Sequence, residues 1–337
     1  MGLKNDGKYY IAPFEDVFNK AYESNWIKLM ENTYFDSEKL DVGHKLRPRL
    51  VYWGFLLNKP DPTPEDFDSI GKLAVAVELI HKASLLLDDF IDKDTSRHGQ
   101  TAFYLEYGVE RAIIYSLNIL SLALKTTNEV FAYKQNSELY FNSMFSIIST
   151  LESMTYGVLK ELDLETVNTH SINSIKEIML LETSELIISS LISGYSLADG
   201  NNKVAISCLK RLGKKVGFIF QTINDLEPFF ESEHSHKGSL NIDVSRDRKN
   251  YCVALLNEFL SKKEKELISS SDSGQLEDLI LNLCDKYNIK SRLLQECNTI
   301  VKNIRDEIHN VEFFSIYKEE FAIFIESVYY VSKNRLN

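Results

Sequence analysis

Apolar residues at helical spacing, with few helix breakers between them, constrain the fold of this chain more than any other feature. Only 14 of its 337 residues are glycine and 6 are proline, the residue types that most often interrupt helices. Apolar side chains recur three or four positions apart, whereas alternating β-branched runs are short and hairpin dipeptides are rare. The sequence therefore predicts an all-α protein.

Polar breaks divide the helical pattern into segments. One segment has clear start signals, because Thr63 can cap the helix, Pro64 suits its first position and Asp66 its first turn. This helix carries His81 and Asp88. Other helices are expected over about residues 9–33, 43–57, 109–133, 136–162, 171–198, 202–228, 248–268, 275–287 and 291–332, with breaks inside the last. No break resembles an interdomain linker, so residues 1–337 are expected to form a single helical-bundle domain.

The overall composition argues against several classes of protein. A net charge of −11 disfavours nucleic-acid binding, which needs clustered lysine and arginine. The four cysteines lie far apart, as expected for reduced core thiols of a cytosolic protein. The first residues lack the apolar region of a signal peptide, and no segment reaches the roughly 20 apolar residues of a membrane span. We expect a cytoplasmic protein that binds no nucleic acid and does not span a membrane.

Three aspartates end an apolar helical stretch in the sequence ELIHKASLLLDDFIDKDTSRHGQ. Asp88 and Asp92 are one turn apart, His81 lies two turns earlier on the same stripe, and Asp89 sits beside them. Carboxylates buried this close together repel one another unless a cation neutralises them. Mg²⁺ is a suitable cation, because it prefers oxygen ligands and often completes its shell with phosphate oxygens. Arg97 could hold a diphosphate by a bidentate contact.

The residues of this motif allow two interpretations. The acids could belong to a solvated helix C-terminus in which carboxylates occur by chance. The preceding run ASLLL is uncharged, however, and favours acids that point into a cavity lined by apolar side chains. An apolar cavity beneath a metal–diphosphate site indicates an isoprenoid substrate.

Four segments, in order along the chain, resemble the trans-isoprenyl diphosphate synthases, the class I head-to-tail prenyltransferases. GHKLRPRL resembles the GKxxRP region of that family, and ELIHKASLLLDDFIDKDTSRHG resembles its first aspartate-rich motif. KKVGFIFQTINDLEPF resembles the segment that leads to the second aspartate-rich motif, and HKGSLNIDVSRDRKN resembles the lysine-rich loop after it. The four segments span residues 43–250, and their combination is more specific than any one of them.

The resemblance implies a fold, a reaction and a set of site residues. The fold is an isoprenoid-synthase-type helical bundle around a deep central cavity, assembled as a homodimer. The reaction is the Mg²⁺-dependent condensation of an allylic diphosphate with isopentenyl diphosphate, with three Mg²⁺ ions held between the two acidic motifs. The metal ligands that it implies are Asp88, Asp89, Asp92, Asn224 and Asp225. The resemblance also makes Asp88, Asp89 and Asp92 the catalytic acids. It places further residues at the diphosphates: Arg97, Lys45, Arg47, His81, Gln221, Lys237 and Lys249.

Several positions depart from the family pattern. The second motif reads NDLEP, in which Asn224 is a neutral ligand and Pro228 takes the third acidic position and disturbs the helix. Histidines, His44 and His98, replace a lysine and an arginine of the pattern, and Glu182 stands where the family usually has lysine. The allylic half of the site is intact, whereas the acceptor half has lost two fixed positive charges.

These departures leave three functions open. The first is elongation of an allylic diphosphate with isopentenyl diphosphate. The second is the same ionisation with another acceptor or with cyclisation, as in peptide prenyltransferases or class I terpene synthases. The third is a catalytically weak subunit of a heteromeric synthase. Small residues also precede the first motif, Ala83 and Ser84 with Ile80 one turn below, where bulky aromatics cap the cavity in the family. We therefore expect any elongated product to be C20 or longer.

Overall fold

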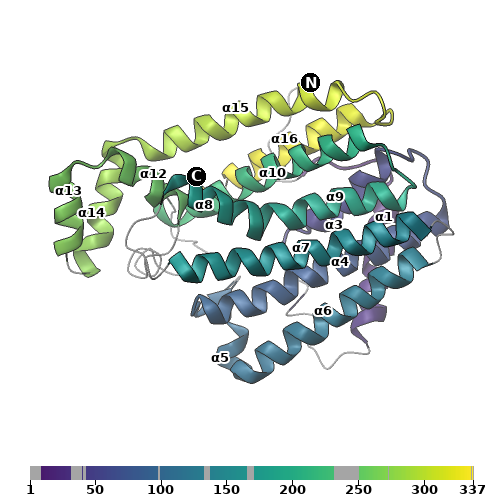
Figure 1. Ribbon diagram of the computed structural model, residues 1–337, viewed down its shortest axis with the longest axis horizontal. Coiled ribbons are helices and arrows are strands. Elements are labelled where there is room, and N and C mark those ends of the chain that lie inside the picture. Colours follow the sequence, from purple (N-terminus) through teal and green to yellow (C-terminus); the bar gives the residue numbers. More distant parts are fainter. Residues whose placement is uncertain are drawn as a thin grey trace.

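The computed structural model confirms the all-α prediction (Figure 1). It describes residues 9–31, 40, 43–97, 99–132, 137–164, 171–230, 250–271, 273–334 and 336. In these ranges the only strands are β1 (Ser96–Arg97) and β2 (Gln100–Thr101), which form a short antiparallel ladder. The helices are α1 (Glu15–Met30), α3 (Leu46–Leu56), α4 (Pro64–Ile91), α5 (Phe103–Tyr107), α6 (Val109–Ala132), α7 (Ser137–Leu164), α8 (Ile172–Met179), the π-helical turn η1 (Leu180–Ser184), α9 (Glu185–Leu197), α10 (Lys203–Phe230), α12 (Tyr251–Phe259), α13 (Lys262–Ser270), α14 (Ser273–Lys286), α15 (Ile289–His309) and α16 (Lys318–Asn334).

Helix α4 begins as its sequence predicts. The Thr63 hydroxyl accepts the Asp66 backbone N–H at 3.2 Å, and the Asp66 carboxylate accepts the Thr63 N–H at 2.8 Å, which completes a capping box before Pro64. The helix runs for 28 residues, about 42 Å at the usual rise. It packs against α1, α3, α6 and α9, and most of its side chains between Ile70 and Leu86 are buried. A continuous buried helix thus carries the first acidic motif.

Two predicted helix boundaries are wrong. The segment expected to be one helix over 248–268 is two helices, α12 and α13, because Ser261 caps a new helix start with Glu264. Helix α10 also continues past Pro228 to Phe230. The proline lies inside the last turn and does not end the helix at that position, although it cannot donate the N–H that the carbonyl four residues earlier would normally accept.

Glycines bring α3 and α9 unusually close together. A Cβ atom on Gly54 would collide with the Leu191 carbonyl oxygen, and one on Gly194 would collide with the Val51 carbonyl oxygen. Only glycine therefore permits this backbone contact on both sides of the interface. The contact fixes α9 and, at its N-terminal end, the π-helical turn η1.

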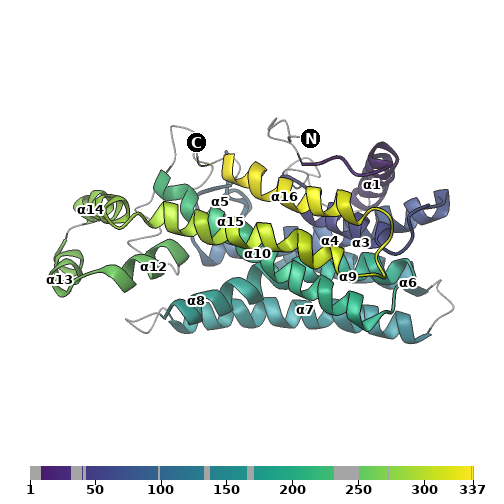
Figure 2. The same cartoon turned by 90° about the horizontal axis from the view of Figure 1, so that it is seen from above.

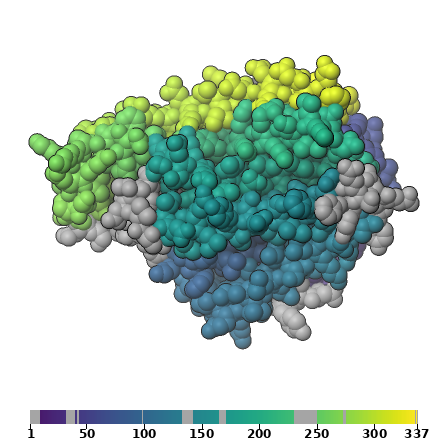
Figure 3. Space-filling view, in the orientation of Figure 1, coloured from purple at the N-terminus to yellow at the C-terminus, as the bar shows by residue number. Residues whose placement is uncertain are grey.

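The helix formed by α8, η1 and α9 is the one described helix that could cross a membrane by length and composition. It covers Ile172–Leu197, and 72% of its apolar window is buried inside the protein. Burial within the bundle therefore explains its apolar composition. Helices α13 and α14 project from one end of the molecule in two perpendicular views, at the left of Figures 1 and 2, and form a lobe in the space-filling view of Figure 3.

Candidate active site

The first acidic motif, Asp88–Asp92, lies where α4 ends. Asp92 is the last residue of this turn, and its N–H bonds to the Asp88 carbonyl at 2.7 Å. Lys93 then adopts a left-handed conformation (φ 53°), and the chain turns into the β1–β2 hairpin. The hairpin returns Arg97 to α4, where its Nε donates to the buried Asp89 carboxylate. The helix end and the hairpin thus hold the motif and Arg97 together.

Two further carboxylates face this motif from other helices. Glu161 on α7 and Glu182 on η1 both act on Asp88. Burial and the negative charge of Asp92 together raise the pKa of Asp88 to about 7, against the opposing effect of Arg97. Burial also raises the pKa of Glu182 to about 10, and Glu161, Asp88 and Asp92 add to that increase. Carboxylates from three elements therefore crowd one side of the bundle.

The crowded acids suit a divalent cation. The Oε1 atom of Glu182 is buried and has no hydrogen-bond partner, and a buried carboxylate oxygen needs a proton or a cation. Gly157 on α7 leaves the space for this side chain, because a Cβ there would lie 2.7 Å from Cγ of Glu182. Across the described part of the chain, no three histidine, cysteine or acidic side chains converge into a ready-made metal centre. Asp88, Asp92, Glu161 and Glu182 nevertheless lie close enough to act on one another, and carboxylate oxygens are ligands that Mg²⁺ prefers.

In the second acidic motif, Asn224–Pro228 on α10, the Asp225 carboxylate is hydrogen-bonded within the protein. Asp225 accepts the Gln221 side-chain N–H on Oδ1 at 2.7 Å and the Tyr251 backbone N–H on Oδ2 at 2.9 Å. The Asn250 side chain also donates to the Asp225 carbonyl at 2.9 Å. This carboxylate therefore stabilises the start of α12, and a metal ion bound to it would compete with these N–H donors.

The predicted diphosphate ligand Gln221 links the two sides of the site. Its Oε1 atom accepts the Thr183 hydroxyl at 2.9 Å, and its Nε2 atom donates to Asp225. Thr183 belongs to the π-helical turn, in which one extra residue per turn alters the direction of the following side chains. The turn therefore fixes Gln221 through Thr183 while Glu182 faces α7.

The predicted acceptor residues lie around the start of α3. Arg47, in the first turn, is 8% exposed, and its Nε atom is buried without a hydrogen-bond partner. The Lys45 ammonium lies over the rings of Tyr22 and Trp26, at 5.5 and 4.9 Å from their centroids. His81 is partly buried on α4. Lys237, Lys249 and His98 lie outside the described residues.

Two side chains of the site were not predicted from the sequence. Glu161 lies far along the chain from the aspartates, and no spacing signal connects it with them. Lys82 is buried on α4 and pairs with Glu78 at 3.3 Å. Their four-residue separation is the signal that could have indicated this pair.

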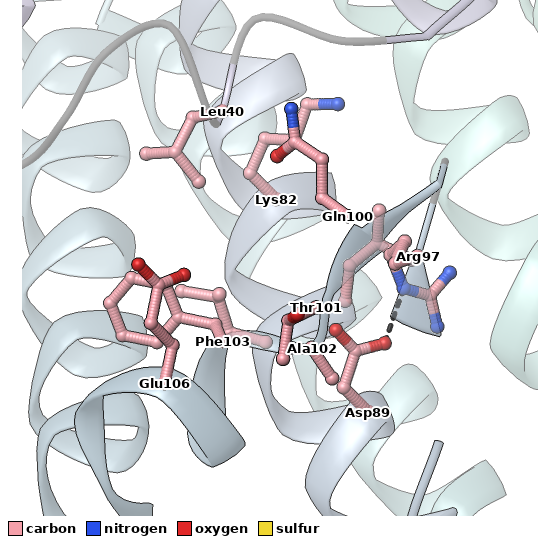
Figure 4. Close-up of a pocket in the computed structure, with 11 residues that line it drawn as sticks. Leu40, Lys82, Asp89, Arg97, Gln100, Thr101, Ala102, Phe103 and Glu106 are labelled. Atoms are coloured by element: carbon pink, nitrogen blue, oxygen red, sulfur yellow. Dashed lines mark hydrogen bonds and ion pairs between the residues drawn. The ribbon is translucent and has the colours of Figure 1, made fainter. Parts of the chain in front are cut away.

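A pocket lies beside Asp89 and Arg97, between α4 and the hairpin (Figure 4). Its lining residues are Leu40, Lys82, Leu85, Leu86, Asp89, Arg97, Gln100, Thr101, Ala102, Phe103 and Glu106. The predicted chain-length residues occupy other positions on α4. Ile80 and Ala83 are buried in the core, and Ser84 donates its hydroxyl to the His81 carbonyl at 2.9 Å. Their effect on product length stays a prediction.

Comparison with known proteins decides the family. The polyprenyl synthetase family model matches residues 31–280. This chain belongs to the polyprenyl synthetase family. A short chain isoprenyl diphosphate synthase of Methanothermobacter thermautotrophicus is 26% identical over 233 residues, which cover 69% of each protein. The farnesyl diphosphate synthase of Micrococcus luteus is 29% identical over 236 residues, 66% of this chain and 74% of that protein.

Solved structures of polyprenyl synthetases share the fold. Heptaprenyl diphosphate synthase from Staphylococcus aureus aligns with a TM-score of 0.78 at 18% identity, over 97% of this chain and 98% of the other. Geranylgeranyl pyrophosphate synthase from Corynebacterium glutamicum, complexed with isoprenyl diphosphate and magnesium, aligns with a TM-score of 0.75 at 16% identity, over 93% and 96%. The predicted isoprenoid-synthase fold and prenyltransferase class are confirmed, and the sequence is a divergent version of them.

Proposed function

We propose that this polyprenyl synthetase is a Mg²⁺-dependent enzyme that joins an allylic diphosphate to isopentenyl diphosphate and releases a C20 or longer diphosphate. The observation that carries the proposal is Asp88, whose ionisation is made costly by burial and by the nearby charge of Asp92 when no cation is bound. Because other acids face Asp88 and Asp92, a divalent ion that binds there would stabilise the folded protein.

The described residues suit the first step of this reaction, the departure of diphosphate from the allylic substrate. Asp88 and Asp92 would hold Mg²⁺, which when bound neutralises charge on the leaving diphosphate. Arg97 would add a guanidinium contact, and Asp89 orients that guanidinium through its Nε hydrogen bond. Such donors assist most when they are already in place as negative charge develops.

One observation favours a second candidate, ionisation with a different acceptor. Glu182 places a carboxylate beside Asp88 and Asp92, where the family pattern has a positive charge. The pKa of about 10 keeps this group protonated at neutral pH, so it supplies no positive charge to hold a second diphosphate. A neutral acceptor would not need that charge.

A single assay separates the candidates. Purified protein is incubated with Mg²⁺, geranyl or farnesyl diphosphate, and labelled isopentenyl diphosphate. Labelled products of C20 or more support the proposed function. Release of diphosphate without chain growth supports the second candidate. A protein that turns over nothing contradicts both and supports the role of a non-catalytic subunit, which addition of candidate partner chains then tests.

We also propose that the protein is a cytoplasmic homodimer. Exposed apolar side chains gather on the neighbouring helices α6 and α7, and they are Ile113, Ile114, Leu117, Phe145, Ile148, Leu159 and Leu162. Large exposed apolar surfaces commonly mark an interface with another protein. Light scattering is expected to give twice the monomer mass, and Ile114→Asp with Leu159→Asp is expected to give monomers. A wild-type monomer at micromolar concentration contradicts this proposal.

A further inference from the structure

A buried lysine lies beside the acceptor residue His81, within the segment that resembles the first aspartate-rich motif. Lys82 is 4% exposed, and its Nζ atom lies 3.3 Å from Oε1 of Glu78, which is 3% exposed. A buried ion pair contributes little net stability, because desolvation of both charges offsets their attraction. Stability alone is therefore a weak reason for this lysine.

The Lys82 ammonium lies beneath the segment that leads into α3. A Cβ atom on Gly43 would be 3.7 Å from Nζ, so the backbone passes directly over the charge. Helix α3 begins three residues later, at Leu46, with no side-chain cap and no acidic residue in its first turn. An uncapped helix N-terminus carries partial positive charge and favours an anion.

Arg47 gives independent support for an anion at this place. It lies in the first turn of α3, it is more than nine-tenths buried, and its Nε atom has no hydrogen-bond partner. It also interacts electrostatically with Glu78, the partner of Lys82. A buried donor without an acceptor is costly. An anionic ligand that reaches Arg47 would remove that cost.

Among the described residues, two further cations and one acid act on Lys82. Burial lowers the pKa of Lys82, and the nearby charges of Lys45 and Arg47 lower it further, whereas Glu78 raises it. Glu78 and Asp88 are the acids that act on Arg47. Lys82 also lines the pocket beside Arg97 and Gln100, so a ligand can approach it (Figure 4).

We propose that Lys82 binds the diphosphate of the second substrate and replaces the positive charge that the family pattern has at position 44. This inference rests on the proposed function, in which the second substrate is isopentenyl diphosphate. Lys82 and Asp88 lie on one continuous helix. A single rigid element therefore carries contacts for both diphosphates, and the acceptor half keeps a fixed cation despite His44.

The alternative is that Lys82 only neutralises Glu78. Calorimetric binding of isopentenyl diphosphate to Lys82→Gln, Glu78→Gln and the double variant separates the two roles, with urea unfolding as the measure of folding stability. Lys72→Gln is the matched control, because Lys72 forms an exposed four-residue pair with Asp68 on the same helix.

A diphosphate-binding role predicts that Lys82→Gln weakens binding by about 10- to 100-fold, as expected for loss of a charged hydrogen bond. The double variant regains stability but binds equally weakly, Lys82→Arg regains part of the affinity, and Lys72→Gln binds like wild type. In turnover, Lys82→Gln raises KM for isopentenyl diphosphate and leaves KM for the allylic substrate near its wild-type value.

Two results would overturn the inference in distinguishable ways. If the double variant binds isopentenyl diphosphate as tightly as wild type, Lys82 serves only Glu78, and the proposed function stands. If wild-type protein ionises allylic diphosphates but binds no isopentenyl diphosphate, the proposed function fails and this inference fails with it.

Discussion

The two acidic motifs of this protein use their carboxylates in different ways. On α4, Asp88 has a pKa raised to about 7, because burial and Asp92 disfavour its charge. On α10, both oxygens of Asp225 accept N–H groups, from Gln221 and from Tyr251. Asp88 of the first motif would therefore be stabilised by a bound cation. Asp225 of the second motif already accepts hydrogen bonds within the protein.

This difference indicates which carboxylates would gain stability from binding a metal ion. Hydrogen bonds stabilise Asp225 in the folded protein, so a metal that took this carboxylate would compete with the start of α12. Repulsion destabilises the acids on α4, so a metal that bound there would relieve it. The first motif is therefore expected to dominate both metal binding and catalysis.

The largest expected difference between the motifs is in turnover. Asp88→Ala or Asp92→Ala is expected to reduce turnover about 1,000-fold or more, because the charge on the departing diphosphate loses its metal-mediated stabilisation. Asp225→Asn is expected to reduce turnover much less. The control is Asp68→Asn, an exposed acid on the same helix. Steady-state kinetics with an allylic diphosphate measures these effects, and equal losses at Asp88 and Asp225 would contradict the comparison.

The motifs are also expected to differ in folding stability. Asp225→Ala leaves the Tyr251 N–H and the Gln221 amide without their acceptor, so we expect the free energy of unfolding to fall by about 2–4 kcal/mol. Asp88→Asn removes repulsion and is expected to stabilise the metal-free protein at neutral pH. Urea unfolding without divalent ions measures both. Destabilisation of similar size by both variants would show that the two carboxylates have the same structural role.

The raised pKa values predict how the stability of the metal-free protein changes with pH. Folding raises the pKa of Asp88 from its ordinary value of 3.8 to about 7, so the folded state holds a proton that the unfolded state releases. Stability from this group is present below pH 4 and is lost as pH rises to 7. Relative to wild type, Asp88→Asn is expected to gain about 4 kcal/mol across that interval.

Glu182 is expected to show a similar loss of stability that continues to higher pH. Its pKa rises from 4.5 to about 10, so Glu182→Gln is expected to gain stability over wild type from pH 5 upward. Urea unfolding at a series of pH values gives both curves. Variants that follow the wild-type curve at every pH would show that these acids are not crowded in the folded protein.

The smallest effect is expected in product length. Ser84 lies one turn before Asp88, so Ser84→Phe is expected to place a ring in the path of the growing chain and shorten the product while turnover continues. Ser121→Phe, on an exposed position of α6, is the matched control. Chromatography of the dephosphorylated products measures their length. An unchanged distribution in Ser84→Phe would remove this position from control of length.

Local signals explain how much of the fold could be predicted from the sequence. The capping signals at Thr63, Pro64 and Asp66 and the long apolar periodicity predicted α4. Both signals depend on residues within a few turns of one another. The break before Ser261 was missed because residues on both sides of it favour helices, and only the Ser261–Glu264 capping box marks the new start. The π-helical turn was also missed, because its register depends on Gly217 making space for Ser184 across the α9–α10 contact.

Sequence signals that reach only a few helical turns also limited the prediction of the site. Helical spacing predicted that Asp88 and Asp92 share a face, and their electrostatic contact agrees with that expectation. Spacing could not show that Glu161 and Glu182 face them, because those residues come from helices far apart in sequence. Nor could it show that Asp225 accepts the Tyr251 N–H, which depends on where the chain returns after the second motif.

Binding of Mn²⁺, followed by electron paramagnetic resonance in the presence of inorganic pyrophosphate, tests most directly whether the α4 acids are the metal site. Wild type and Asp225→Asn are expected to bind the ion, and the double variant Asp88→Asn with Asp92→Asn is expected to lose binding although it folds. Undiminished Mn²⁺ binding by that double variant would contradict the account.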